Sequence, residues 1–439
     1  MMPSDCSGTH SGTADGAASA PGGYRAVARC DALGAAPYSE ENDRLFRPYL
    51  SAAHRATRAR IAGWMQEAGM NTRVDAAGNS VGRYEGLKPD APALLIGSHL
   101  DTVRDAGRYD GTLGVVLGIE VVAHYAARGV RFPFALEVIG FGDEEGSRFP
   151  VSMLTSRAVA GLLQEAPVGM HDAAGVSLQA ALAEEGLLLE HMPKAARRPE
   201  DYVAYLEAHI EQGPVLEAEN RAVGVVTAIA AQYRFRVSIQ GVAGHAGTIP
   251  MALRQDALAA AAEAVLAVES VGRAGPPDLV ATVGQLNVSP GVPNVVPGHV
   301  VFSIDVRAGE AAVRNAAAEE IRTALEALAA RRNVTLEMTL QQDLPATPCD
   351  ASLTRLLGDA VYTITGEAAR RMVSGAGHDA MVLAALAPVC MLFIRCAGGI
   401  SHNPAEAVDA ADVEQAFQVM TRFIEEFAGH YLDSKERPV

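Results

Sequence analysis

A histidine and two aspartates stand close together around one apolar stretch of the chain. His99 and Asp101 come directly after the apolar run at residues 93–97, and Asp110 precedes the next apolar stretch. A neutral imidazole is a good ligand for a divalent cation, and a nearby carboxylate can accept the other ring N–H and fix the tautomer. The two oxygens of Asp110 could bridge two cations. The alternative is that His99 and Asp110 only cap turns.

Three adjacent carboxylates follow a second apolar run. Asp143, Glu144 and Glu145 come after residues 134–141. At the end of a buried strand such a cluster is unfavourable unless cations compensate it, because like charges repel and burial removes their hydration. One glutamate would then bind metal, and its neighbour would stay free as a general base for metal-activated water. A solvated acidic loop is the alternative, and the long apolar run before it argues against that reading.

Two further turns carry histidines after expected strands. His209 lies in the turn AHIEQGP, after residues 202–208, and His402 lies in GGISHNP, after residues 389–394. The carboxyl ends of parallel strands are where α/β proteins bind ligands. Other histidines lack such surroundings and are interpreted as surface or helix residues: His10, His54, His124, His171, His191, His299 and His430.

The elements that must position these residues follow an α/β pattern. Short apolar runs alternate with helical patterns from about residue 50 to the C-terminus. The expected strands are Ala93–Ile96, Phe134–Phe141, Tyr202–Ala208 and Val389–Ile394, and the expected helices are His54–Ala68, Thr112–Ala127 and Val413–Phe427.

The middle third of the chain differs in its pattern. Its expected strands alternate apolar and polar residues, as in a sheet with one wet face, and its helices are rich in alanine. They comprise a strand pair at Val225–Gln240, strands at Leu279–Val288, Val300–Val306 and Thr335–Leu340, and helices at Ala252–Val268 and Ala311–Ala330. We predict a separate two-layer α+β domain at residues 225–341, inserted into a first domain formed by residues 24–224 and 342–439. Residues 1–23 are expected to be a disordered leader.

Composition excludes several classes of protein. The 439 residues, of which 49% are hydrophobic, favour two domains and exclude a disordered chain. A net charge of −16 argues against nucleic acid or an anionic membrane as a partner. The five cysteines form no C-x-x-C pair and offer no thiolate metal site. Since no apolar stretch approaches the ~18 residues of a membrane span, we expect a cytoplasmic protein.

The motifs HLDT, YDG, GDEEG, HIEQGP and SHNPAE occur in that order, and together they resemble the M20-type di-metal amidohydrolases. The resemblance is to the branch of allantoate amidohydrolases and N-carbamoyl-L-amino acid hydrolases, and it extends from about Tyr24 to Tyr431. HIEQGP is particular to this branch, since related peptidases usually have a carboxylate where His209 stands. The resemblance implies a metallopeptidase-like catalytic domain with a mixed sheet flanked by helices, and an inserted lid and dimerisation domain.

The resemblance also implies a pair of divalent cations bridged by Asp110. Mn²⁺ or Zn²⁺ is expected, and Co²⁺ is possible. The other ligands would be His99 and His209 for one cation, and Glu145 and His402 for the other.

Further roles follow from the same resemblance. Glu144 would be the general base, which takes a proton from the attacking water and gives it to the leaving nitrogen. Asp101 would orient His99. A cis peptide bond is expected after Asp110.

The inserted domain carries three more matches. His245, in GVAGHAGT, is expected to reach the active site of the partner subunit in a homodimer and to stabilise an oxyanion; the alternative is a turn histidine packed by glycines. Asn294 and Arg307 match the substrate-binding pair of the lid. Arg307 offers a planar fork to a carboxylate, and the alternative for it is a surface ion pair with Asp305 or Glu310.

Two residues outside the inserted domain are expected to contact substrate. The amide of Gln212 can read a ureido group. His378, in GAGHD, could hydrogen-bond substrate, whereas capping of a helix by Asp379 is the plainer interpretation of that motif.

The expected reaction is hydrolysis of the terminal ureido C–N bond of allantoate, with release of ammonia and carbon dioxide. Residues 104–110 and 396–402 resemble the allantoate branch most. The runner-up is an N-carbamoyl-L-amino acid, which also carries a carboxylate and a ureido group. More distant alternatives are an M20-type peptidase and a non-catalytic homologue that keeps the fold.

Overall fold

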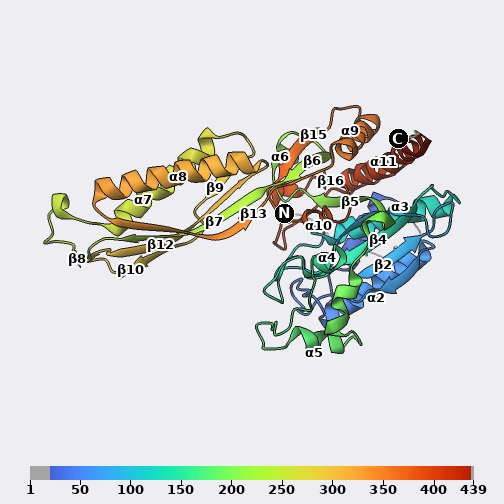
Figure 1. The fold of residues 1–439 in the computed structure, drawn as a ribbon, viewed down its shortest axis with the longest axis horizontal. Coiled ribbons are helices and arrows are strands. Elements are labelled where there is room, and N and C mark those ends of the chain that lie inside the picture. The colour runs from blue at the N-terminus through green and yellow to red at the C-terminus, as the bar shows by residue number, and fades with distance from the viewer. Residues whose placement is uncertain (1–19, 437–439) are drawn as a thin grey trace, which may run out of the picture.

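The structure, a computed structural model, describes residues 20–436 and consists of a larger domain and an elongated arm that extends from it (Figure 1). Of the leader expected at residues 1–23, residues 1–19 lie outside the described residues. Helix α1 (Gly23–Ala32) begins at the last residue of that expected leader.

A mixed sheet forms the centre of the larger domain. Its strands, in spatial order, are β1 (Asn71–Val74), β2 (Ser80–Tyr84), β4 (Ala135–Phe141), β3 (Ala93–His99), β5 (Tyr202–Ile210), β16 (Val389–Ile394), β6 (Val223–Ile229) and β14 (Thr347–Pro348), with β15 (Arg370–Ser374) also paired to β6. The four central strands β4, β3, β5 and β16 are parallel, whereas β2 and β6 run antiparallel to their neighbours in this group. The expected mixed sheet is confirmed, and its parallel strands end along one edge.

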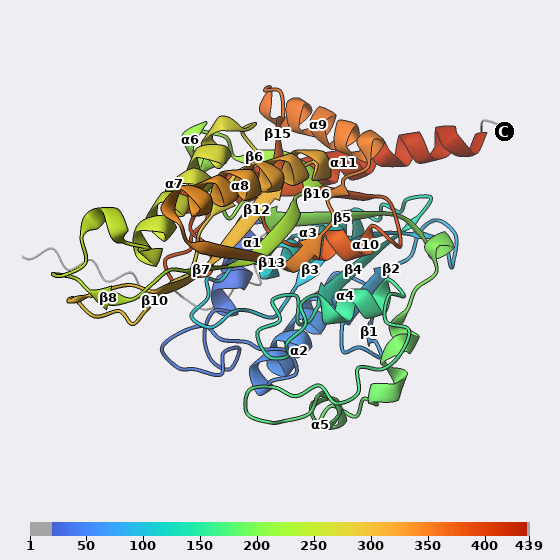
Figure 2. The ribbon, with the colours of Figure 1, turned by 60° about the vertical axis from the view of Figure 1, so that its left-hand side comes forward.

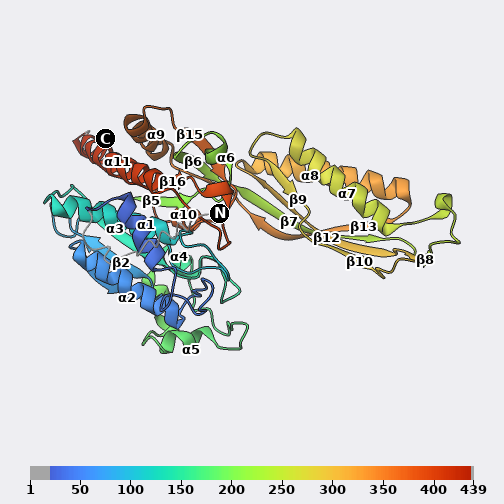
Figure 3. The same ribbon diagram turned by 180° about the vertical axis from the view of Figure 1, so that it is seen from behind.

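Helices cover both faces of this sheet. Strands β3 and β4 are buried along their whole length, because their apolar side chains point alternately into two cores. The first core contains α1, α2 (Ala52–Glu67), α3 (Thr112–Ala127), α9 (Ala351–Thr365) and α11 (Ala410–Glu436), and several of these helices are in front in Figure 3. The second core contains α4 (Leu154–Val159) and α10 (Asp379–Leu383). Two short helices, α5 (Leu178–Ala183) and α6 (Val215–Ala218), lie in connecting segments.

The arm, here called the lid domain (residues 231–344), is an antiparallel sheet with two long helices on one face (Figure 2). Its strands are β10 (Leu286–Ser289), β12 (His299–Ala308), β7 (Ala231–Gln240) and β13 (Thr335–Leu344), with β9 (Val280–Thr282) beside β12, and its helices are α7 (Ala257–Ala274) and α8 (Ala311–Arg332). Alternate residues of β12 are buried under these helices, as the alternating sequence predicts. A small ribbon of β8 (Gly244–His245) and β11 (Val295–Val296) lies at the far tip of the lid domain.

Two expected elements are divided in the structure. The strand pair expected at residues 225–240 belongs to two different sheets, since β6 pairs with β16 in the large sheet and β7 pairs with β12 and β13 in the lid domain. The expected domain boundary at residue 225 therefore falls inside β6. The strand expected at residues 279–288 is two short strands, β9 and β10. None of the described helices is both long enough and apolar enough to cross a membrane.

Candidate metal centre and pocket

The predicted metal ligands lie at the carboxyl ends of the four central parallel strands. His99 is the last residue of β3, and His209 is the penultimate residue of β5. Glu145 follows β4, and His402 follows β16. Because these strands are neighbours in the order β4, β3, β5, β16, their carboxyl ends meet at one edge. Asp110 joins them from the loop that leads into α3.

Asp110 is the centre of this group. Its Oδ1 lies 3.2 Å from Nε2 of His209 and 3.7 Å from Nε2 of His99. Its Oδ2 lies 3.1 Å from Nε2 of His402, which is 3.3 Å from Oε1 of Glu145. Donor atoms of His99, Asp110 and His209 lie within 4.8 Å of one another, and so do those of Asp110, Glu145 and His402. Two ligand groups therefore share one carboxylate.

Backbone carbonyls fix the tautomers of two buried histidines. Nδ1 of His99 lies 3.0 Å from the carbonyl oxygen of Asp101, and Nδ1 of His209 lies 2.9 Å from that of Ile210. A carbonyl oxygen only accepts, so each Nδ1 donates its proton to that oxygen, and Nε2 is the ring atom directed at Asp110.

Asp101 contacts His99 mainly through its backbone instead of its side chain. Its carboxylate oxygen is 3.7 Å from Nδ1 of His99, a longer distance than that of its carbonyl oxygen. The buried carboxylate instead accepts the backbone N–H groups of Glu144 at 3.1 Å and Glu145 at 3.2 Å. Asp101 thus joins the end of β3 to the loop that carries the acidic pair.

The turn at Asp110 is held from the C-terminal part of the chain. Oε1 of Glu406, a buried residue, accepts the backbone N–H groups of Tyr109 at 2.8 Å and Asp110 at 3.1 Å. The expected cis bond after Asp110 is wrong, since the cis bonds among residues 20–436 are Ala36–Pro37 and Ser289–Pro290. The chain reverses instead at Gly111, where φ is +62° and the N–H of Thr112 bonds back to the Asp110 carbonyl at 2.6 Å.

The ionisable groups of the site perturb one another strongly. Burial opposes ionisation of Asp110, but hydrogen bonds from three histidines hold the pKa of its carboxyl well below the usual value. Hydrogen bonds to Asp110 and Glu145 raise the pKa of His402 to about 10. Burial, with the charge of Glu145, raises the pKa of the Glu144 carboxyl well above its usual value. The site thus holds protons that binding of cations would displace.

The two groups fit divalent cations by donor type and by size. Each combines imidazole nitrogen with carboxylate oxygen and lacks thiolate, which suits Mn²⁺, Zn²⁺ or Co²⁺. Metal–ligand bonds of about 2.0–2.2 Å place two ligands of one ion within roughly 4.4 Å of each other. Donor atoms that all lie within 4.8 Å of one another are therefore close to coordinating distance.

The ligands open into a pocket of about 330 Å³ between the larger domain and the base of the lid domain. This volume suits a small organic ligand. The lining residues are His99, Asp110, Glu144, Glu145, Ser152, Met153, His209, Gln212, Gln232, Arg234, Arg307, Gln342, Leu344, Ala376, Gly377, Met381 and His402. Nε2 of Gln212 donates to the carboxylate of Asp110, 3.2 and 3.1 Å from its two oxygens.

Two arginines of the lid domain face this pocket. Nε of Arg307 lies 2.7 Å from Oδ1 of Asp305, and NH2 of Arg234 lies 3.1 Å from Oδ2 of the same carboxylate. NH1 of Arg307 also donates to the carbonyl of Gly375 at 2.6 Å. Arg307 therefore forms the ion pair with Asp305 that the sequence suggests as the alternative to a substrate-binding role. It also lines the pocket.

Other predicted residues lie outside the pocket lining. His378 is buried behind His209, with ring centroids 4.5 Å apart, and its Nε2 is 2.7 Å from Oγ of Ser374. The carboxylate of Asp379 is buried and does not cap α10. His245, on β8, and Asn294, directly before β11, are exposed at the tip of the lid domain, and Figure 1 shows β8 away from the larger domain.

Several pocket or support residues were not predicted. Glu406 belongs to the SHNPAE motif, but nothing in the sequence shows that its partners are the amides of a turn at residues 109–110. Arg234 lies opposite Asp305 across β7 and β12, so the register of the lid sheet would have identified it. Gln232 and Gln342 line the pocket but belong to no motif that marks them in the sequence.

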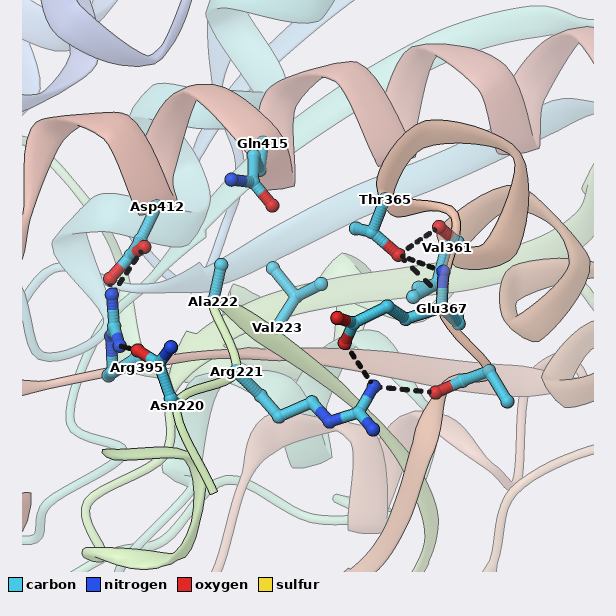
Figure 4. A pocket seen from close by; sticks show the side chains of 11 residues that line it. Asn220, Arg221, Ala222, Val223, Val361, Thr365, Glu367, Arg395, Asp412 and Gln415 are labelled. Atoms are coloured by element: carbon cyan, nitrogen blue, oxygen red, sulfur yellow. Dashed lines mark hydrogen bonds and ion pairs between the residues drawn. The ribbon is translucent and has the colours of Figure 1, made fainter. Parts of the chain in front are cut away.

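Another polar pocket, between β6, α9 and α11, contains none of the predicted residues (Figure 4). Its two arginines are already neutralised, since Arg221 pairs with Glu367 at 2.7 Å and Arg395 pairs with Asp412 at 2.6 Å. It therefore offers no unpaired charge to a ligand.

Known proteins match nearly the whole chain. Residues 95–426 match Peptidase family M20/M25/M40. "Allantoate deiminase" of Arabidopsis thaliana is 38% identical over 430 residues, which cover 91% of this chain and 81% of that protein. "N-carbamoyl-L-amino acid amidohydrolase" of Geobacillus stearothermophilus is 41% identical over 356 residues, or 81% of this chain and 87% of that one. A solved amidase of the hydantoinase/carbamoylase family from Burkholderia multivorans has a TM-score of 0.85 at 32% identity and covers 92% of this chain and 97% of its own. The chain therefore belongs to Peptidase family M20/M25/M40, as a hydrolase of the branch that contains these amidohydrolases.

Proposed function

We propose that this enzyme hydrolyses the terminal ureido C–N bond of allantoate. The observation that carries the proposal is a pair of ligand groups sharing Asp110, beside the separate carboxylate of Glu144, in a pocket with a cationic and polar lid wall. Relatives named for allantoate and for N-carbamoyl-L-amino acids both support hydrolysis of a ureido group.

The chain would hold two divalent cations. Asp110 would bridge them, with His99 and His209 as further ligands of one cation and Glu145 and His402 as further ligands of the other. When bound, the cations lower the pKa of a water molecule and polarise the scissile carbonyl.

Glu144 is the general base of the proposed reaction. It lines the pocket and is not one of the proposed metal ligands, so its carboxylate is available to accept a proton. It takes a proton from the water that attacks the ureido carbon. It then gives this proton to the leaving nitrogen as the C–N bond breaks. The carbamate formed in this step then decomposes with cleavage of its remaining C–N bond, so that ammonia and carbon dioxide are both released.

The substrate carboxylate would bind to the lid domain. Arg307 and Arg234 place two guanidinium groups on the pocket wall, and planar guanidinium groups match a carboxylate. Gln212 lies against Asp110, where its amide can contact the ureido group that is cleaved.

We also propose a homodimer in which the tip of the lid domain covers the partner subunit's pocket. His245 and Asn294 would then reach substrate in the other subunit, and His245 would stabilise the oxyanion. The tip exposes 55% of Val242, 77% of Met251 and 74% of Leu253. These large apolar side chains lie close in sequence to His245, and exposed apolar surface of this kind is typical of an interface.

A substrate panel tests the proposed function. Metal-free protein is reconstituted separately with Mn²⁺, Zn²⁺ and Co²⁺, and ammonia release from allantoate is compared with that from N-carbamoyl-L-methionine. We expect faster release from allantoate with at least one metal. Faster hydrolysis of N-carbamoyl-L-methionine with every metal would contradict the choice of allantoate.

Hydrolysis of N-carbamoyl-L-amino acids is the second candidate. Met153, Leu344 and Met381 place apolar surface in the pocket, where an apolar side chain would pack. A peptidase activity receives less support, because His209 stands where related peptidases usually have a carboxylate.

A further inference from the structure

The wall of the pocket formed by the lid domain consists of two rows of side chains. The rows follow from the register of β13, β7 and β12: Gln342, Arg234 and Asp305 form one row, and Leu344, Gln232 and Arg307 form the next. Five of these six side chains line the pocket, and Asp305 lies among them as the partner of both arginines.

A β-bulge decides which residues of β13 join these rows. Before the bulge, Leu336, Met338 and Leu340 lie opposite Ile239, Val237 and Phe235, which are buried under α7 and α8. Strict alternation would keep residues 342 and 344 on this helix side and would turn residues 341 and 343 to the pocket. The register shift between Leu340 and Gln342 reverses that order.

The bulge removes one carboxylate from the pocket. Asp343 lies on the helix side, where its Oδ1 accepts from NH1 of Arg314 at 2.8 Å. Arg314, a buried residue of α8, also donates to the carbonyls of Gln232 at 3.1 Å and Leu344 at 2.8 Å. Helix α8 thus holds the bulge in place, and a wall that binds a carboxylate is free of the repulsion that Asp343 would cause.

Gln342 differs from the other polar side chains of this wall, because its amide has no hydrogen-bond partner among the described residues. Nε2 of Gln232 donates to Asp305 at 2.5 Å, and the guanidinium of Arg234 donates to the same carboxylate. Among residues 20–436, no hydrogen bond of the Gln342 amide is found. The half-buried amide therefore presents one N–H donor group and one carbonyl acceptor to the pocket.

We infer that Gln342 determines specificity by pairing with an uncleaved amide or ureido group of the substrate. This inference rests on the proposed function and extends it, because it assigns the enzyme to acids that carry a second amide-like arm. A neutral amide matches such an arm in both donor and acceptor. A substrate with an apolar arm would leave Gln342 buried without a partner, which lowers its transition-state binding.

The test compares two neighbouring glutamines. Gln342→Leu keeps the size of the side chain and removes its hydrogen bonds, whereas Gln341→Leu changes the exposed bulge residue, which does not line the pocket. We measure kcat/KM of the metal-loaded enzyme for allantoate and for N-carbamoyl-L-methionine. Gln342→Leu is expected to lower the value for allantoate by about 10- to 100-fold without lowering that for N-carbamoyl-L-methionine. Gln341→Leu is expected to change neither value.

The outcomes separate the inference from the proposed function. An equal loss on both substrates in Gln342→Leu, or an equal effect of Gln341→Leu and Gln342→Leu, overturns the role of Gln342 and leaves the proposed function in place. A wild-type enzyme that hydrolyses neither compound overturns both. Thermal unfolding of each variant, with Gln342→Ala as a smaller replacement, separates a folding defect from a change in specificity.

Discussion

Asp110 takes part in both ligand groups, so single ligands should differ in their effect on metal content. Asp110→Ala removes the shared ligand and is expected to abolish binding of both cations. His402→Ala removes a ligand of one group only and should retain the cation held by His99 and His209. Metal content per chain, measured after dialysis, checks this. His171→Ala, at an exposed histidine outside the site, is the control. Equal metal loss in both ligand variants would contradict a bridging role.

Glu144 is expected to affect turnover without affecting metal content. Glu144→Gln removes the basic oxygen and should lower kcat by about 10²- to 10⁴-fold, the usual contribution of a positioned base. Metal content should stay at the wild-type level, since the proposed ligands are other residues. Wild-type turnover in this variant would refute the assignment of the base.

Asp379 gives the metal-free protein a predictable response to pH. Burial, with the charge of Glu207, raises the pKa of Asp379 from its ordinary value of 3.8 to about 8. The folded state therefore keeps a proton that the unfolded chain releases, and the stabilisation present below about pH 4 is lost as pH rises through 8. Between pH 7 and 8, metal-free wild type should lose up to about 1.4 kcal/mol more unfolding free energy per pH unit than Asp379→Asn. Denaturant unfolding in the presence of a chelator measures the difference, and parallel pH profiles would contradict it.

At the scale of elements, α8 and the bulge of β13 act as one unit. Arg314→Leu leaves the carbonyls of Gln232 and Leu344 and the carboxylate of Asp343 without a shared donor. The two carbonyls lose a donor, which costs roughly 1–3 kcal/mol, whereas the exposed carboxylate of Asp343 is hydrated. The KM for allantoate should rise because Gln342 is no longer held toward the pocket. Arg322→Leu changes an exposed arginine of the same helix and is the control. An unchanged KM and melting temperature in Arg314→Leu would show that the bulge does not need this arginine.

The sequence predicts the helices and strands of the larger domain because each is marked by its own run of apolar residues, independent of distant parts of the chain. Helix α3 and strand β16 have the expected bounds, since continuous apolar runs can only be buried elements. The predicted ligands come together because His99, Glu145, His209 and His402 follow or end such a run, and Asp110 precedes one. The bulge at Gln341 and the separation of β6 from β7 are not predictable in this way, because both depend on which distant strands pair. The same reason hides the contact between Glu406 and the turn at Asp110, which are 296 residues apart.

The whole molecule places His245 far from the pocket of its own chain, which permits a complementation experiment. Chains carrying Glu144→Ala and chains carrying His245→Ala should each be nearly inactive as homodimers. After mixing and subunit exchange, half of the dimers are mixed and each holds one intact site, so about a quarter of wild-type activity should return. Activity of the mixture no greater than the mean of the two variants would show that His245 does not act across subunits.

Strand β16 stands between β5 and β6 in space but leaves the ribosome after both of them. During translation the nascent chain therefore carries β5 with an unpaired edge until residues 389–394 emerge, and such an edge invites pairing with other chains. His402 and the Glu406 that fixes the bridging turn are made later still. A message truncated between the codons for residues 394 and 402 would yield a polypeptide that keeps the strands of the large sheet but lacks His402 and Glu406. Such a chain would hold at most the cation proposed for His99 and His209, and we expect it to be a target for chaperones and proteases instead of a partly active enzyme.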